Sequence, residues 1–372
     1  PRDPSPQPAR SSERPAVSTS RTVPPSAAGR RSVTVIGAAV VLLHLVGWGS
    51  LLALVLGTDT PQGGTGLFVG LALSAYALGV RHAFDADHIA AIDNATRSLM
   101  ARGRESAATG FWFALGHSSV VLVSVLLLTL GLEAFAGGLA DEGSGLRHAA
   151  GIWGGTVSGL FLVTAGVLNL AVLLRLRRAR RAARTGALDP AELDAHLADR
   201  GVLHRVLHPV TRAVDRPARM YPVGFLFGLG LDTAASIGLF VMAGGLAPEL
   251  PRYAVLVLPV LFTAGMTLFD SADGILMHRV YGWASVDARR KLNYNVTVTT
   301  VSVVIAFVIG GTSLLSVLAE LVRPTGGALA LVGAIDLNFL GMAVIVLFGL
   351  VWLGARGLDR IRRDSRPVPV RG

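Results

Sequence analysis

The chain has 372 residues, of which 52% are hydrophobic and only 16% are charged, well below the roughly 25% of soluble domains. Because it contains no cysteine, disulfides, thiolate metal sites and cysteine nucleophiles are excluded. The net charge of +10 would suggest a nucleic-acid partner in a soluble chain, but the basic residues here lie between long apolar segments, so we expect a membrane protein and no nucleic acid.

The N-terminal residues 1–32 are rich in Pro, Ser and Arg. Such a composition buries too little apolar surface to fold, so we predict a disordered cytoplasmic tail. No convincing small-residue cleavage site follows the first apolar run, and we therefore do not expect a cleaved signal peptide.

Eight apolar segments follow, and several reach the ~18 residues that suggest a membrane span. They predict an all-α, polytopic membrane protein with eight transmembrane helices, forming one permease domain over residues 33–354. The second segment is too long for one straight span, so we expect it to be broken or to continue past the membrane. The segments lie at about 33–57, 66–97, 109–136, 150–175, 219–246, 252–272, 292–318 and 333–354.

The distribution of basic residues predicts the orientation. Thirty of the 34 Lys and Arg residues lie in the two tails and in alternate loops, three lie in the other loops, and Arg81 lies within a span. By the positive-inside rule, both termini are cytoplasmic, as are the long loop 176–218 and the basic tail 355–372. Three histidines of the long loop could bind metal, but we interpret them as solvated surface residues: His196, His204 and His208.

The second segment contains the sequence RHAFDADHIAAIDN. A charged side chain near the bilayer centre costs roughly 2.5–3.5 kcal/mol on insertion scales, so this cluster needs a cation, a proton or a water-filled path. Imidazoles among carboxylates suit a borderline divalent metal such as Ni²⁺, Co²⁺ or Zn²⁺. The structural alternative is that Arg81 with Asp85, and Asp93 with Arg97, form ion pairs along the helix. We predict metal ligands at His82, Asp85, Asp87 and His88, with Asp93 lining the path.

The spacing of this motif does not fit a regular helix around one ion. At about 100° per residue, His82, Asp87 and His88 point in three directions roughly 120° apart. Either Asp85 replaces Asp87, since it shares a face with both histidines, or the helix unwinds. We predict unwinding, because interrupted helices recur at the substrate sites of transporters.

Other spans carry polar side chains that extend the predicted site. His117 follows in the third span, Asp232 in the fifth and Asp270 near the cytoplasmic end of the sixth, and we predict all three as ligands. We predict that four further side chains line the path: Ser118, Thr233, Met266 and Asn295.

An internal repeat is also visible. The stretch ALGVRHAFDA resembles FGLGLDTAA, and FALGHSS resembles FTAGMTL. His82 lies 35 residues before His117, and Asp232 lies 34 residues before Met266. Because the copies are three spans apart, they cross the membrane in opposite senses, which predicts an inverted repeat with substrate at its interface.

These motifs resemble the bacterial nickel/cobalt permease family (NiCoT). The family signature of a histidine, four residues and Asp-His stands here as RHAFDADHI, and FALGHSSVV, LGLDTAAS and GMTLFDSADG resemble its further motifs. The resemblance covers about residues 33–354 and implies an eight-span, high-affinity importer of Ni²⁺, Co²⁺ or both. The chain departs from the family pattern where members commonly have a glutamate, and that role is not transferred to Ser236.

We therefore predict a secondary transporter that imports Ni²⁺ or Co²⁺ as a multi-pass protein of the bacterial cytoplasmic membrane. His82, Asp87 and His88 would capture the ion, while His117 and Asp232 would complete or relay the site. We do not expect an enzyme or a bound cofactor, since the ion is the substrate and no G-K-[ST] motif for ATP is present. The expected partners are the ion and the lipid bilayer, with no obligatory protein partner. The alternatives are an efflux protein, a metal sensor, or the membrane component of an ATP-driven uptake complex.

Overall fold

The computed structural model describes residues 27–57, 62–130, 143–184, 214–230, 252–283 and 288–323, together with isolated positions between and after these ranges. Within them every regular element is a helix. The α-helices are α1 (Ala27–Gly57), α2 (Gln62–Ala83), α3 (Ala86–Ala101), α4 (Thr109–Thr129), α6 (Gly145–Arg184), α9 (Met220–Gly228), α11 (Arg252–Val255), α12 (Val257–Trp283) and α13 (Ala288–Val322).

Six stretches of these helices are long and apolar enough to cross a membrane. They match the first four predicted segments and the sixth and seventh. Part of the predicted fifth segment and most of the eighth lie outside the described residues. Helix α6 continues to Arg184, past the start of the predicted loop 176–218. Its arginine-rich end contains good helix formers, which extend the helix beyond the apolar run. The stretches are Arg31–Gly57, Gly66–Ala83, Thr109–Thr129, Gly145–Arg178, Val257–Val280 and Val296–Val322.

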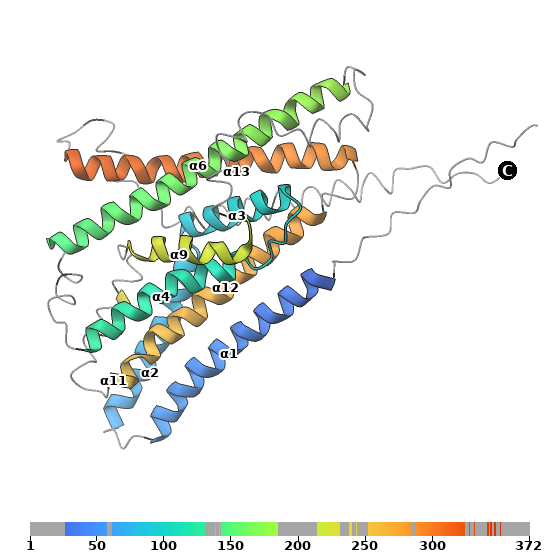
Figure 1. Cartoon of the computed structure of the whole chain (residues 1–372). Coiled ribbons are helices and arrows are strands. Elements are labelled where there is room, and N and C mark those ends of the chain that lie inside the picture. Colours follow the sequence, from blue (N-terminus) through green and yellow to red (C-terminus); the bar gives the residue numbers. More distant parts are fainter. Residues whose placement is uncertain are drawn as a thin grey trace, which may run out of the picture.

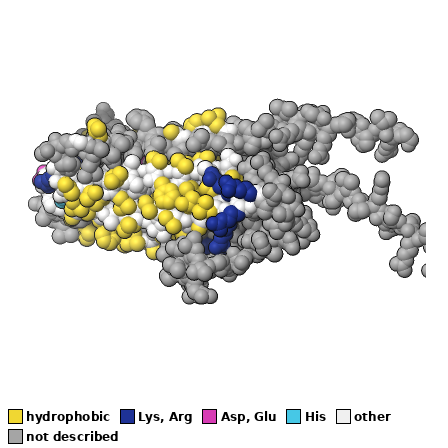
Figure 2. Space-filling view, turned by 90° about the horizontal axis from the view of Figure 1, so that it is seen from above, with side chains coloured by type: hydrophobic (Ala, Val, Ile, Leu, Met, Phe, Trp, Pro, Cys, Tyr) yellow, Lys and Arg dark blue, Asp and Glu magenta, His cyan; other side chains and the backbone are white. Residues whose placement is uncertain are grey.

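The outer surface of the described helices is apolar. Exposed leucines include Leu45 and Leu56 of α1 and Leu321 of α13, which are 66%, 78% and 61% exposed. Figure 2 shows hydrophobic side chains over the middle of one face, with Lys and Arg side chains only toward the ends of its coloured area. An apolar band between charged ends is what a lipid bilayer requires, so the chain is a multi-pass membrane protein.

Helix α3 lies between two groups of helices (Figure 1). On one side it packs against the crossed pair α6 and α13, and on the other against α12 and α4. Helix α1 lies at the edge, packing mainly against α12. Two apolar cores result. One is centred on α3 and includes Ile89, Ile92 and Leu99. The other is centred on α2 and α12 and includes Leu261 and Phe262.

Two glycines set the crossing of α2 and α12. A Cβ atom on Gly79 would overlap the carbonyl oxygen of Phe262. A Cβ atom on Gly265 would lie 2.7 Å from the carbonyl oxygen of Tyr76. Only small residues allow helix backbones to approach this closely in a membrane.

Helices α4 and α9 cross in the same way. A Cβ atom on Gly116 would overlap the carbonyl oxygen of Tyr221, and one on Gly224 would overlap that of Phe113. A Tyr-x-x-Gly segment thus packs against a Phe-x-x-Gly segment at both crossings. Helix α2 packs against α12, and α9 packs against α4. Each half of the chain therefore provides the packing partner for a helix of the other half.

The third pair, α6 and α13, has a reciprocal contact at its centre. A Cβ atom on Gly159 would lie 3.0 Å from the carbonyl oxygen of Gly310, and one on Gly310 would lie 3.0 Å from that of Gly159. The three helix pairs together support the predicted repeat, with α2, α4 and α6 related to α9, α12 and α13.

The packing also favours one register for that repeat. Helix α2 ends at Ala83, four residues after Gly79, and α9 ends at Gly228, four residues after Gly224. This register aligns Asp232 with Asp87 in the sequence. The match of FALGHSS with FTAGMTL agrees with the packing, since Gly116 and Gly265 take equivalent places.

Candidate metal centre

The second predicted span is broken at the motif, as expected from the angular mismatch of its ligands. Helix α2 ends at Ala83 and α3 begins at Ala86. Between them the backbone N–H of Phe84 donates to the carbonyl of Arg81, and that of Asp85 donates to the carbonyl of His82, both at 3.0 Å. These tight turns close α2, and Asp85 then adopts an extended conformation with φ −64° and ψ 140°.

Asp85 occupies the N-cap position of α3 but does not cap it. Aspartate is favoured there because its carboxylate usually accepts a backbone N–H bond of the first turn. Here no such bond forms. Instead Asp85 Oδ2 lies 2.7 Å from Nδ1 of His82 and accepts its hydrogen bond. The break therefore frees a carboxylate that orients the imidazole of His82.

Three buried imidazoles converge beside this break. His82 lies in the last turn of α2, His88 in the first turn of α3 and His117 in the middle of α4. They are 1%, 1% and 5% exposed. One nitrogen from each lies within 4.8 Å of the others. His82 Nε2 and His117 Nε2 are 2.9 Å apart. The centroid of the His88 ring lies 4.5 Å from that of His82 and 4.8 Å from that of His117.

The distance between the two closest nitrogens fits a single transition-metal ion. Imidazole nitrogens bound at about 2.0–2.1 Å, at octahedral or tetrahedral angles, lie about 2.8–3.4 Å from one another. The 2.9 Å between His82 and His117 is within that range. The hydrogen bond from His82 Nδ1 to Asp85 leaves the lone pair of Nε2 directed at His117. This is the carboxylate–histidine arrangement that fixes the tautomer of a metal ligand.

Without an ion, the two close nitrogens share one proton. His117 Nε2–H donates to His82 Nε2 if His82 keeps its proton on Nδ1. His117 Nδ1 is buried and has no hydrogen-bond partner among the described residues. A tautomer of His117 with its proton on Nδ1 would leave the lone pair of Nε2 available to a metal ion.

Asp270 of α12 lies next to the imidazoles. Its Oδ2 is 3.4 Å from His88 Nδ1, and both side chains are 1% exposed. This is an ion-pair distance without hydrogen-bond geometry, and neither Asp270 oxygen has a hydrogen-bond partner within the described ranges. A buried carboxylate without a partner is costly unless a cation or a water molecule compensates it.

Aromatic rings enclose the centre. The ring of Phe113 meets that of His88 edge-on at 4.8 Å, and the ring of Phe262 lies 5.7 Å from that of His82. Both phenylalanines also provide carbonyls to the glycine crossings. The packing that brings α2, α4, α9 and α12 together thus also shields the imidazoles from water.

The other predicted site residues lie either outside the cluster of three imidazoles or outside the described residues. Asp87 Oδ1 accepts the backbone N–H of His88 at 3.0 Å and is not among the three clustered ligands. Met266, Asp93 and Ser118 are buried. Asn295 lies on α13, but its side chain is outside the description, as are Asp232 and Thr233 altogether.

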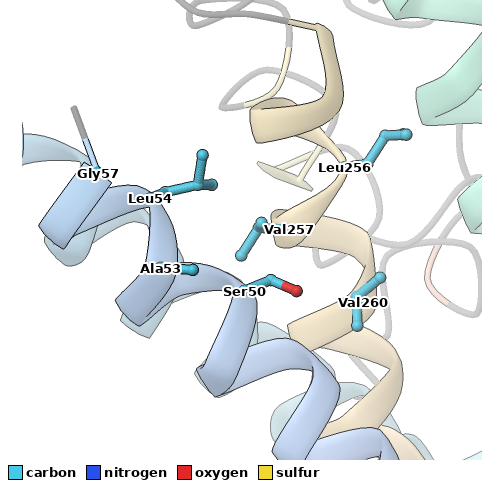
Figure 3. A pocket seen from close by; sticks show the side chains of 7 residues that line it. All are labelled: Ser50, Ala53, Leu54, Gly57, Leu256, Val257 and Val260. Atoms are coloured by element: carbon cyan, nitrogen blue, oxygen red, sulfur yellow. The ribbon is translucent and has the colours of Figure 1, made fainter.

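A separate cavity of about 530 Å³ lies between the end of α1 and the start of α12 (Figure 3). Ser50 provides the one polar side chain of its lining, which otherwise includes Leu54, Leu256 and Val260. With no imidazole or carboxylate in this lining, the cavity offers no ligands for a transition metal. The buried histidines are the candidate metal centre in the described part of the chain.

Comparison with known proteins agrees with this chemistry. The chain matches the family model described as high-affinity nickel-transport protein over residues 68–357. It is 46% identical over 338 residues to the nickel transporter NicT of Mycobacterium tuberculosis, covering 90% of this chain and 91% of that protein. It is 41% identical over 331 residues to the cobalt transport protein NhlF of Rhodococcus rhodochrous, covering 88% and 91%.

A third relative is the nickel transporter NixA of Staphylococcus aureus. The identity is 39% over 317 residues, covering 85% of this chain and 90% of that protein. No solved structure matches the chain.

Proposed function

The chain belongs to the high-affinity nickel-transport protein family, and from this premise we propose that it is a secondary transporter that imports Ni²⁺, Co²⁺ or both. The family is one of transporters and not of enzymes. The observation that carries the proposal is the group of three buried imidazoles at the break between α2 and α3. Ionisable side chains buried in a membrane protein are rare and mark ion or proton pathways, and three imidazoles are the ligands that Ni²⁺ and Co²⁺ accept.

We assign the capture of the ion to His82, His88 and His117. Asp85 orients His82, and Asp270 provides negative charge beside His88. Asp87 and Asp232, which the repeat register aligns, are proposed as further ligands that approach the ion when the site rearranges. Four side chains are proposed to line the path: Ser118, Thr233, Met266 and Asn295.

The transport domain is proposed to comprise residues 33–354 with eight spans in the bacterial cytoplasmic membrane. Both termini, the long loop and the tail 355–372 would be cytoplasmic, and the two halves would form an inverted repeat. The reciprocal helix pairs and the matching ends of α2 and α9 support this arrangement. No obligatory protein partner is proposed.

The membrane potential is proposed to drive import. Moving a divalent cation inward gains about 4.6 kcal/mol per 100 mV, twice the value for a single charge. Because the imidazoles and Asp270 lie within the protein core, part of this potential falls between the outer surface and the site.

Metal accumulation in nickel-starved bacterial cells tests the proposal. Expression of the chain should raise cell-associated radioactive Ni²⁺, and His82→Ala or His88→Ala should abolish the increase at unchanged protein abundance. His148→Ala, which alters a histidine exposed near the start of α6, is the matched control and should transport normally. A fall in cellular Ni²⁺ would indicate efflux, and retained uptake in both variants would refute the site.

Cobalt is a second substrate favoured by one observation. The relative named a cobalt transport protein is 41% identical over 88% of this chain, close to the 46% identity of the relative named a nickel transporter. Imidazole ligands bind both ions. The same cells, supplied with radioactive Co²⁺ in competition with Ni²⁺, give the preference directly.

A further inference from the structure

We propose that Trp153 of α6 is a positioning residue for the metal centre, because its indole N–H fixes the point at which α9 ends beside the imidazoles. This inference rests on the proposed function, since the centre concerned is the one assigned to Ni²⁺ or Co²⁺. Trp153 lies in the membrane-length stretch Gly145–Arg178 and is 45% exposed, so its ring faces the lipid. It acts from outside the site and touches none of the proposed ligands.

Helix α9 ends at Gly228, within the predicted fifth span, and its last carbonyls need donors. The N–H of Gly230 donates to the carbonyl of Phe227 at 2.9 Å. Among the described residues, no backbone N–H donates to the carbonyl of Leu226. The indole Nε1–H of Trp153 donates to that carbonyl at 3.0 Å. Because the hydrocarbon core contains no water to replace a missing donor, the indole satisfies the end of the helix.

The equivalent end of α2 is closed by its own backbone. In the repeat register Arg81 corresponds to Leu226, and the carbonyl of Arg81 accepts the N–H of Phe84 at 3.0 Å. Helix α13 has no matching donor, because Val304 takes the place of Trp153 when both are counted from the glycines of the reciprocal contact. The indole bond therefore belongs to the second half of the repeat alone, where the helix end lacks the backbone bond.

The last turn of α9 adjoins two of the three imidazole ligands. A Cβ atom on Gly228 would lie 2.9 Å from the carbonyl oxygen of His117. The ring of Phe227 meets that of Phe113 edge-on at 5.2 Å, and the ring of Phe113 meets that of His88 edge-on at 4.8 Å. A displacement of this turn would therefore move the backbone that carries His117 and the rings that pack on His88.

Loss of the indole bond would change where α9 ends. The next backbone donor for the Leu226 carbonyl, in an α-helix, is the N–H of Gly230, which would have to leave Phe227. Each residue added to a helix turns the chain by about 100°, so this exchange would redirect the backbone after α9. Phe161 of α6 also packs edge-on against Phe227, with ring centroids 5.8 Å apart, but that contact holds the side chain and not the carbonyl. The indole bond is therefore the contact that selects the helix end.

Two substitutions in the full-length chain separate the N–H group from the bulk of the ring. Trp153→Phe keeps an aromatic ring and removes the donor. Trp153→His removes the six-membered ring but keeps a donor, because imidazole Nε2 occupies the same place along the side chain as indole Nε1. The matched control is Tyr221→Phe, which removes the 2.8 Å hydrogen bond to Ser119 at the exposed start of the same helix. Ni²⁺ affinity is measured by calorimetry in detergent, alongside the thermal stability of the metal-free protein.

We expect Trp153→Phe to bind Ni²⁺ about tenfold more weakly than wild type and Trp153→His to bind it within about threefold. Both phenylalanine variants lose one hydrogen bond and should share the same small loss of thermal stability, while Tyr221→Phe should keep wild-type affinity. Wild-type affinity in Trp153→Phe would overturn the proposal and leave Trp153 as a bilayer anchor of α6. Equal losses in Trp153→His or in Tyr221→Phe would overturn it as well. If the wild-type chain neither binds nor transports Ni²⁺ or Co²⁺, it is the proposed function that fails.

Discussion

Substitutions of Asp85 test whether the break between α2 and α3 supports metal binding through His82. Its position could make it a cap of α3 or a support for His82, and the structure favours the second role, because its carboxylate bonds to His82 at 2.7 Å and makes no cap bond. Removing a carboxylate behind a metal-binding imidazole typically lowers metal affinity by about 10–100-fold, or about 1.4–2.7 kcal/mol. We expect this loss in Asp85→Ala.

Two matched variants separate the two roles. Serine is as good an N-cap residue as aspartate, so Asp85→Ser should keep the thermal stability of the protein but bind Ni²⁺ as weakly as Asp85→Ala. Asn accepts a hydrogen bond without the charge, so Asp85→Asn should fall between Ala and wild type. Calorimetric titration of the purified chain gives the affinities. Wild-type affinity in Asp85→Ser would refute the reasoning.

Three further predictions concern the packing around the site. Gly110→Ala should prevent recovery of monodisperse protein, because its Cβ atom would overlap the carbonyl oxygen of Asp270, whereas Gly70→Ala, with nothing within 4 Å, should behave as wild type in size-exclusion chromatography. Arg97→Met should destabilise the protein by about 1.5–3 kcal/mol in denaturant titration, because two buried charged hydrogen bonds to α13 are lost; an unchanged midpoint would contradict this. Glu320→Gln should alter stability by less than about 1 kcal/mol, because Glu320 and His148 form an exposed pair, and a larger change would show that this pair holds α6 to α13.

The sequence predicted much of the fold because the bilayer makes hydropathy informative. Six predicted segments coincide with described membrane-length helices. The break at Phe84–Asp85 could be predicted because His82, Asp87 and His88 cannot face one point from a regular helix. It could not be predicted from Pro or Gly, since neither occurs between Val80 and Ala101.

Other features depend on contacts that a single sequence does not display. The cluster of His82 with His117 joins α2 and α4, whose relative depth is set by their contacts with α12 at Gly79 and Gly110. The register of the repeat could not be predicted because short apolar strings align in several ways, while the glycine contacts favour one register.

The central claim is that three imidazoles, from both sides of a helix break and from α4, bind one ion. X-ray absorption at the nickel edge of the Ni²⁺-loaded protein tests it most directly. We predict the multiple scattering of three imidazoles with Ni–N distances of about 2.0–2.1 Å, as for other imidazole-bound ions, and two imidazoles in His117→Ala. A spectrum of oxygen ligands alone, or one that His117→Ala leaves unchanged, would contradict the account.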